Sequence, residues 1–146
     1  MAISGAFSGG CNCGAVRYRA VDTDDVVTCY CKQCQRQTSH AVSAVHTALE
    51  TLEIQDPKGA LRWYAASPGA RRGFCSTCGS SLFWQQVLPA EEPGQPGTIP
   101  ANDFLSVMAG SIDDTTDLAL ASQIYVDGQA QFHCLDESVP ASEAPK

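Results

Sequence analysis

The stretch Arg72-Gly-Phe-Cys-Ser-Thr-Cys-Gly-Ser-Ser-Leu-Phe-Trp84 contains two cysteines separated by two residues and followed directly by a glycine. One tight turn with this spacing can offer two thiolate ligands to a tetrahedral metal ion. Gly79 permits the positive φ with which the backbone can wrap the metal. The residues after Cys78 are typical of a strand, whereas a thioredoxin-like redox pair would lead into a helix. The stretch therefore predicts a metal-binding turn that leads into a strand.

The segment Cys11-Asn-Cys13-Gly14 is the natural complement of this turn. Together Cys11, Cys13, Cys75 and Cys78 would form a closed four-thiolate zinc site that joins segments separated by 61 intervening residues. A closed site of this kind is structural, and zinc binding contributes on the order of 10–16 kcal/mol in zinc-finger peptides. Because that exceeds the marginal stability of a domain, we expect the metal-free chain to be unstable.

The middle cluster, Cys29-Tyr-Cys31-Lys-Gln-Cys34, offers three thiolates within six residues. Three protein ligands leave one tetrahedral position open, as a catalytic or substrate-binding zinc requires. The alternative is that a fourth protein ligand closes a second structural site. The candidates for that fourth ligand are Cys134, His133, His40 and His46. For His40 and His46, an ordinary surface or half-buried position is the simpler interpretation.

The chain has eight cysteines in 146 residues, and their clustering argues against a disulfide framework. Cysteines one or two residues apart rarely reach the geometry that a bridge between them needs. We also expect the thiols to stay reduced in the cytosol. Cys134 is unassigned: an inert thiol, a fourth ligand and a reactive thiol all remain open.

The composition, with 44% hydrophobic and 17% charged residues, suits one compact soluble domain. Residues 1–80 hold eight Lys/Arg against six Asp/Glu, and residues 81–146 hold one against ten, so the net charge of −7 is concentrated in the second half. Binding to nucleic acid needs a basic patch, so we expect no such partner. No apolar run approaches the ~18 residues of a membrane span, and residues 1–10 lack signal-peptide features. We expect a cytoplasmic protein that does not contact membranes.

The apolar periodicity predicts a mainly β, antiparallel domain stabilised by zinc, with one short helix over Cys31–Thr38. We expect the domain to span residues 1–136, with a flexible tail over 137–146 and a mobile surface loop over Pro89–Pro100. We expect Phe83 and Trp84 to lie in the core. The expected strands are Ala15–Val21, Val26–Cys29, Ala41–Ala48, Leu52–Gln55, Leu61–Ala66, Arg72–Cys75, Ser81–Gln86, Phe104–Ala109 and Ile124–Val126.

Four runs, in this order, are similar to those of a known family. They are Gly9-Gly-Cys-Asn-Cys-Gly-Ala-Val-Arg-Tyr18, Cys29-x-Cys31-x2-Cys34 followed by Arg36, the Arg72–Trp84 run, and Val107-Met-Ala-Gly-Ser-Ile-Asp-Asp114. Over roughly residues 9–126 the chain resembles the GFA family (glutathione-dependent formaldehyde-activating enzyme, CENP-V/GFA). The resemblance implies a zinc-dependent β-tent fold with two zinc ions per chain. It implies structural zinc on Cys11, Cys13, Cys75 and Cys78, and a second, catalytic zinc on Cys29, Cys31 and Cys34.

The activity that the resemblance implies is a carbon–sulfur lyase reaction, S-(hydroxymethyl)glutathione ⇌ glutathione + formaldehyde, with glutathione or another small thiol as the partner. A three-thiolate zinc carries a net negative charge, so a basic neighbour would help to hold an anionic thiol. The candidates are Lys32, Arg36, Arg71 and Arg72. Tyr30 stands where the family commonly has histidine, and this difference bears on the chemistry. The alternative function is a non-catalytic, zinc-stabilised β domain that binds a protein or small ligand.

Overall fold

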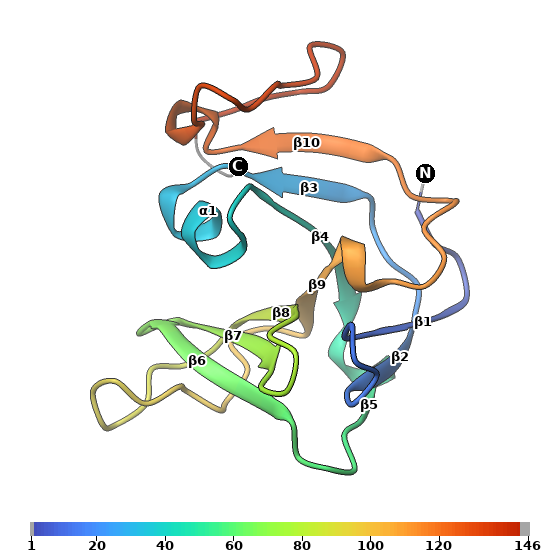
Figure 1. The fold of residues 1–146 in the computed structure, drawn as a ribbon, viewed down its shortest axis with the longest axis vertical. Helices are drawn as coiled ribbons and strands as arrows, with labels where there is room; N and C mark the ends of the chain where they lie inside the picture. Colours follow the sequence, from blue (N-terminus) through green and yellow to red (C-terminus); the bar gives the residue numbers. More distant parts are fainter. Residues whose placement is uncertain (1, 144–146) are drawn as a thin grey trace.

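The computed structural model describes residues 2–143 and is mainly β, as predicted (Figure 1). The strands are β1 (Ala6–Gly10), β2 (Arg17–Val21), β3 (Val26–Cys29), β4 (Val42–Ala48), β5 (Glu53–Gln55), β6 (Leu61–Ser67), β7 (Ala70–Cys75), β8 (Ser81–Gln86), β9 (Phe104–Met108) and β10 (Leu120–Ile124). The single α-helix of the described residues, α1, spans Lys32–Thr38. Three short 3-10 helices are η1 (Leu49–Thr51), η2 (Ala109–Ser111) and η3 (Val126–Gly128).

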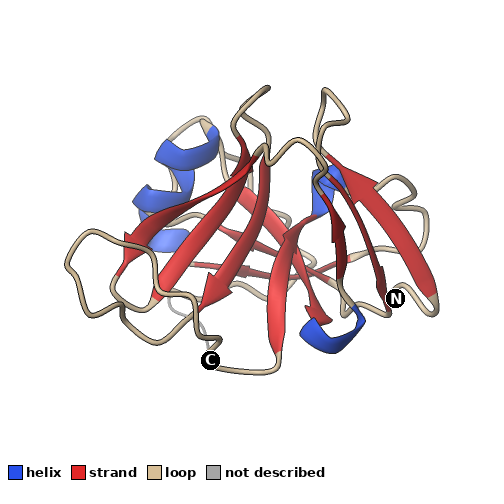
Figure 2. Ribbon diagram, turned by 90° about the horizontal axis from the view of Figure 1, so that it is seen from below, coloured by secondary structure: helices blue, strands red, loops and turns tan. Residues whose placement is uncertain are grey.

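The strands form two sheets that lean toward each other when seen from below (Figure 2). The smaller sheet has the order β1-β2-β5, and the larger has the order β10-β3-β4-β9-β8-β7-β6. The strand pairings are antiparallel, as predicted, except that β10 runs parallel to β3. Helix α1 lies between β3 and the β6–β7 hairpin (Figure 1).

The main core lies between the two sheets and is centred on Tyr18, which is 2% exposed. Its ring meets Phe7 of the same sheet and Phe83 of the larger sheet edge-on, with centroids 6.5 and 5.3 Å apart. Burial raises the pKa of Tyr18 to about 12, and its hydroxyl lies 2.6 Å from the hydroxyl of Ser111. This aromatic contact therefore ties the two sheets together.

Two strands differ from the sequence-based expectation by more than two residues at an end. Strand β1 was not expected, because Gly9 and Gly10 have low strand propensity. Gly9 pairs with Tyr18, and a Cβ atom at this position would lie 2.2 Å from the Tyr18 hydroxyl, so the strand needs a residue without a side chain. The last strand was expected at Ile124–Val126 but ends at Ile124, because Tyr125 adopts a left-handed conformation with φ of 53°.

The chain between β8 and β9 and the chain after β10 are both hydrogen-bonded to the sheet. The expected loop over residues 89–100 is present, and its base is joined by the bond from Leu88 N–H to the Ile99 carbonyl (2.8 Å). At the expected tail, Gln123 N–H donates to the Pro140 carbonyl, and Ser142 N–H donates to the Gln123 carbonyl, both at 2.9 Å. Residues 140–142 thus lie along β10, and residues 144–146 lie outside the described residues.

Candidate metal centres

The first group of sulfur atoms joins two distant segments of the chain. Cys11 and Cys13 follow β1, Cys75 ends β7, and Cys78 lies in the turn before β8. The four Sγ atoms all lie within 4.8 Å of one another, with 3.6 Å from Cys11 to Cys13 and 3.8 Å from Cys13 to Cys75. A tetrahedron with ~2.3 Å metal–sulfur bonds has edges of about 3.8 Å. The four thiolates therefore match the size of one closed tetrahedral site.

Two glycines shape the turns that present these sulfurs. Gly14 and Gly79 have φ of 82° and 80°, a conformation that side chains with a Cβ rarely adopt. The N–H of Gly79 donates to the Cys75 carbonyl (2.7 Å), and that of Gly14 donates to the Cys11 carbonyl (3.2 Å). Each pair of cysteines is therefore held on a tight turn, as the sequence predicted.

Neutral donors surround the first group of sulfurs. The backbone N–H of Val16 donates to Cys11 Sγ (3.2 Å). The Ser80 hydroxyl accepts from Asn12 N–H (2.9 Å), which leaves its proton to point at Cys78 Sγ, 3.2 Å away. The hydroxyl and then the backbone N–H of Ser80 lower the pKa of the Cys78 thiol to about 5. These contacts favour the thiolate form that a metal ion requires.

The second group of sulfur atoms is local in sequence. Cys29 ends β3, Cys31 is the N-cap of α1, and Cys34 lies in the first turn of that helix. The three Sγ atoms lie within 4.8 Å of one another, and the N–H of Cys34 donates to Cys31 Sγ (3.3 Å). Cys31 thus serves both as the helix N-cap and as a possible metal ligand. A cysteine at the N-cap points its sulfur back over the first turn of the helix, toward the sulfur of Cys34.

The thiols of this group differ strongly in acidity. The hydrogen bond from Cys29 lowers the pKa of Cys34 to about 5, with Arg72 and Cys31 adding to the effect and burial opposing it. The same hydrogen bond, together with burial, raises the pKa of Cys29. The Cys29 hydrogen bond and the Arg72 guanidinium thus favour the thiolate form of Cys34.

No His, Cys, Asp or Glu among residues 2–143 joins the three sulfurs as a fourth member of the group. His46 instead lies against Asp24, with its Nδ1 atom 2.7 Å from the carboxylate. The His40 ring packs against His133 at 4.5 Å between centroids. Cys134 is exposed.

His133 is buried beside the Tyr30 ring, at 5.0 Å between centroids. Its Nδ1 atom accepts the N–H of Ala130 (2.9 Å), so in the neutral ring the proton is on Nε2. That Nε2 atom is buried and has no hydrogen-bond partner. A protonated Nε2 has no lone pair to give to a metal ion, which disfavours His133 as the fourth ligand.

Of the four basic candidates, one contacts the second group of sulfurs. Lys32 and Arg36 are exposed on α1. The guanidinium of Arg71 lies 3.9 Å from the centre of the Trp63 ring and points away from the group. Arg72 is 6% exposed, and its Nη2 atom donates to Cys34 Sγ (3.5 Å). Arg72 was among the candidates predicted from the sequence but could not be distinguished from Arg71. The sequence did not show which of the two side chains lies on the face of β7 that meets the sulfurs.

Apolar side chains pack around the second group and form a small core of their own. Val42 and Met108 are buried there, and Ala44 and Trp84 are half-buried. Phe83 lies in the main core, as predicted, but Trp84 lies on the side of the sheet that carries the sulfurs. Neighbouring strand residues face opposite sides, so the two aromatic residues could not share one core.

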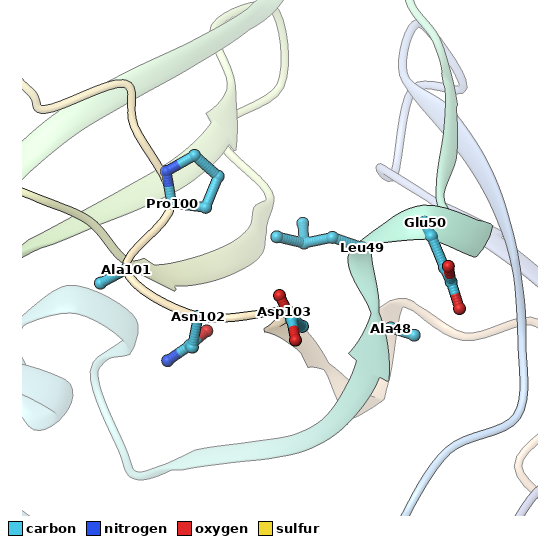
Figure 3. Close-up of a pocket in the computed structure, with 7 residues that line it drawn as sticks. All are labelled: Ala48, Leu49, Glu50, Pro100, Ala101, Asn102 and Asp103. Carbon is cyan, nitrogen blue, oxygen red and sulfur yellow. The ribbon is translucent and has the colours of Figure 1, made fainter.

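The structure also has a surface pocket of about 470 Å³ away from both sulfur groups (Figure 3). Its walls come from the end of β4 with η1 and from the segment before β9. The lining residues are Ala48, Leu49, Glu50, Pro100, Ala101, Asn102 and Asp103. This pocket offers carboxylates and no thiol, and it is not part of the candidate site.

The fold and the sulfur geometry define a mainly β protein in which two cysteine groups can each hold a metal ion. The family model described as glutathione-dependent formaldehyde-activating enzyme, GFA, matches residues 6–128. The chain belongs to the GFA family, which confirms the resemblance found in the sequence. Among residues 2–143, none of the helices has the length and apolar character of a membrane span.

A solved structure supports the fold. The chain is similar to a crystal structure of a Rhodobacter sphaeroides protein determined by structural genomics, with 22% sequence identity and a TM-score of 0.52. The match covers 75% of this chain and 91% of the other chain. None of the curated proteins matches the sequence significantly.

Proposed function

We propose that the chain is a zinc-dependent carbon–sulfur lyase that forms or cleaves S-(hydroxymethyl)glutathione or a related small thiol compound. The observation that carries this proposal is the group of three sulfurs with no fourth His, Cys, Asp or Glu among residues 2–143. Three protein ligands leave a coordination position for a substrate, whereas four close the site. The family description, which names glutathione and formaldehyde, supports these two reactants.

The donor chemistry of both groups suits zinc. Thiolate ligands select zinc, Cu(I) or iron–sulfur clusters over hard cations, and the sulfur separations of the first group match a tetrahedral zinc. In this proposal Cys11, Cys13, Cys75 and Cys78 hold a structural zinc. The residues that hold the second zinc are Cys29, Cys31 and Cys34. When bound there, zinc supplies Lewis acidity toward a thiol sulfur or a carbonyl oxygen.

The reaction itself needs little besides positioning. In S-(hydroxymethyl)glutathione the C–S bond breaks, the C–O bond becomes the carbonyl of formaldehyde, and the hydroxyl proton passes to the sulfur. The apolar packing of Val42, Met108 and Trp84 excludes water from one side of the sulfurs. A drier site strengthens the electrostatic interactions on which such a reaction depends.

Gln35 fixes the loop that carries two of the three sulfurs. It is 8% exposed, and its Nε2 atom donates to the Tyr30 carbonyl (2.7 Å) and the Gly128 carbonyl (2.6 Å). The peptide between Cys29 and Cys31 is thereby attached both to α1 and to the segment after β10. When the protein ligands are held rigidly, no protein group can shift into the free coordination position. That position therefore stays available for a substrate.

The test compares one cysteine from each group, with Cys134→Ala as the matched control. Wild type and the control are expected to contain two zinc ions per chain and to release formaldehyde from S-(hydroxymethyl)glutathione at equal rates. Cys31→Ala is expected to stay folded and lose activity, whereas Cys75→Ala is expected not to fold. Full activity of Cys31→Ala would contradict the proposal. A zinc-loaded wild type that does not accelerate the reaction would favour a non-catalytic binding domain.

A further inference from the structure

A buried cation lies against the second sulfur group. Arg72 is 6% exposed, and its guanidinium makes two hydrogen bonds, both through Nη2: to Cys34 Sγ (3.5 Å) and to Gln33 Oε1 (3.1 Å). Its Nε atom is buried without a partner. No carboxylate among residues 2–143 forms an ion pair with it. Within the part of the chain that the structure describes, the one group able to carry a negative charge that this guanidinium contacts is therefore the Cys34 sulfur.

An unpaired buried charge is expensive, so its position calls for an explanation. The neighbouring Arg71 shows the ordinary solution on the other face of β7, where it stacks on Trp63 and donates to Gln85 (2.9 Å). Trp84 is the cross-strand neighbour of Arg72, but among residues 2–143 no aromatic ring stacks on the Arg72 guanidinium, which contacts Cys34 Sγ. A guanidinium in that position contributes its charge to the site.

The charge count of the two groups shows what this cation does. Three thiolates with one divalent metal ion carry −1, and a fourth ligand that is itself a thiolate brings the group to −2. Adding Arg72 makes these values 0 and −1. The four-cysteine group reaches −2 by itself, and the sulfur contacts described there come from the neutral Val16 N–H and Ser80 hydroxyl. Arg17 also lies near Cys11 but is paired with Asp113. A buried cation that donates directly to a sulfur atom thus distinguishes the open group from the closed one.

Gln33 holds the guanidinium in place. Its Oε1 atom accepts from Arg72, and its Nε2 atom donates to the Ala66 carbonyl (2.9 Å) at the end of the β6–β7 hairpin. Figure 1 shows α1 beside this hairpin. One glutamine therefore connects the helix that carries Cys34 to the strand pair that carries Arg72, and the distance between charge and sulfur is set by the fold.

We propose that Arg72 is a positioning residue whose charge makes the Cys29/Cys31/Cys34 metal site prefer an anionic fourth ligand, a thiolate, over a neutral one. This inference rests on the proposed function, since it assumes that a metal ion binds the three sulfurs with one position free. It extends that function by assigning the choice of a thiolate to one side chain outside the metal ligands.

The experiment measures ligand preference on protein loaded with Co²⁺, whose absorption spectrum reports a change of ligand. Two probes are titrated at one pH: 2-mercaptoethanol, which binds as a thiolate, and imidazole, which binds neutral. The variants are Arg72→Gln, which removes the charge, Arg72→Lys, which keeps a charge, and Arg71→Gln as the matched control on the opposite face. Metal content and thermal unfolding are measured for each variant.

Arg72→Gln is expected to weaken thiolate binding at least tenfold, since a full charge acts over a few ångströms at low effective dielectric, and to change imidazole binding less than twofold. Arg71→Gln and Arg72→Lys are expected to keep the thiolate-to-imidazole ratio of wild type within about threefold. An equal loss for both probes, or no loss, would overturn the inference. If Arg72→Gln does not fold, the Arg72→Lys variant provides the test. Loss of the preference for thiolate over imidazole in folded Arg72→Lys would then overturn the inference. A wild type that binds neither probe overturns the proposed function as well.

Discussion

Replacing Gly9 by alanine tests how closely the two sheets approach. The added Cβ atom would lie 2.2 Å from the Tyr18 hydroxyl and 2.4 Å from the Ser111 carbonyl oxygen, both far inside van der Waals contact. Overpacking costs about 1–3 kcal/mol. Weakening the bond between the Tyr18 and Ser111 hydroxyls adds about 1 kcal/mol. We expect a loss of about 3 kcal/mol, which for a domain of this size lowers Tm by about 10 °C.

The assay is urea and thermal unfolding of the zinc-loaded variant in the same excess of zinc as wild type. Gly110→Ala is the matched control, because a Cβ there meets nothing within 4 Å, and we expect its Tm within about 2 °C of wild type. Adding Tyr18→Phe to the Gly9 variant removes the nearest atom but leaves the Ser111 carbonyl oxygen at 2.4 Å and the ring Cζ atom at 2.5 Å, so recovery should be partial. A Gly9→Ala Tm equal to that of the control would refute the packing described for β1.

Two further outcomes are expected from the same protein. Removing the metal with a chelator under reducing conditions should unfold the chain, because the free energy of metal binding exceeds the stability of a typical domain. Circular dichroism would show this as a loss of β structure. A metal-free chain that stays folded would contradict the expectation. Gln35→Leu should cost about 2 kcal/mol in urea unfolding, since it removes the donor of the buried Tyr30 carbonyl and of the more exposed Gly128 carbonyl. Asp113→Asn, which breaks the exposed pair with Arg17, should cost less than about 1 kcal/mol.

The spacing of the cysteines predicted both sulfur groups because metal ligands impose local rules on the sequence. A pair such as Cys75 and Cys78 needs a turn of fixed length and a glycine after it, and these features can be read without knowing the fold. The partner of that pair, across 61 intervening residues, could also be inferred, since a thiolate pair needs two more ligands to close a tetrahedron. Helix α1 was also predicted, over Cys31–Thr38, and its first turn contains Cys34.

Long-range packing was the part that sequence patterns could not predict. Strand β1 was missed because glycine has a poor strand propensity. Gly9 is needed there because any side chain would collide with Tyr18 of the paired strand. Trp84 packs against the smaller core, as a core residue, but the sequence could not tell which of the two cores it joins or separate Arg72 from Arg71. Both assignments depend on which face of the sheet meets α1. That face is decided by the register of β7 against β8, in which Arg72 pairs with Trp84.

The attachment of residues 140–142 to Gln123 affects how the molecule behaves at high concentration. Strand β10 is the outermost strand of the larger sheet on that side, and unpaired edge strands invite pairing with another chain. The two backbone bonds of Gln123, to Pro140 and from Ser142, use the groups that a second molecule would need there. The chain therefore covers one edge of its own sheet against aggregation, and shortening it to residue 136 would uncover that edge without removing any cysteine.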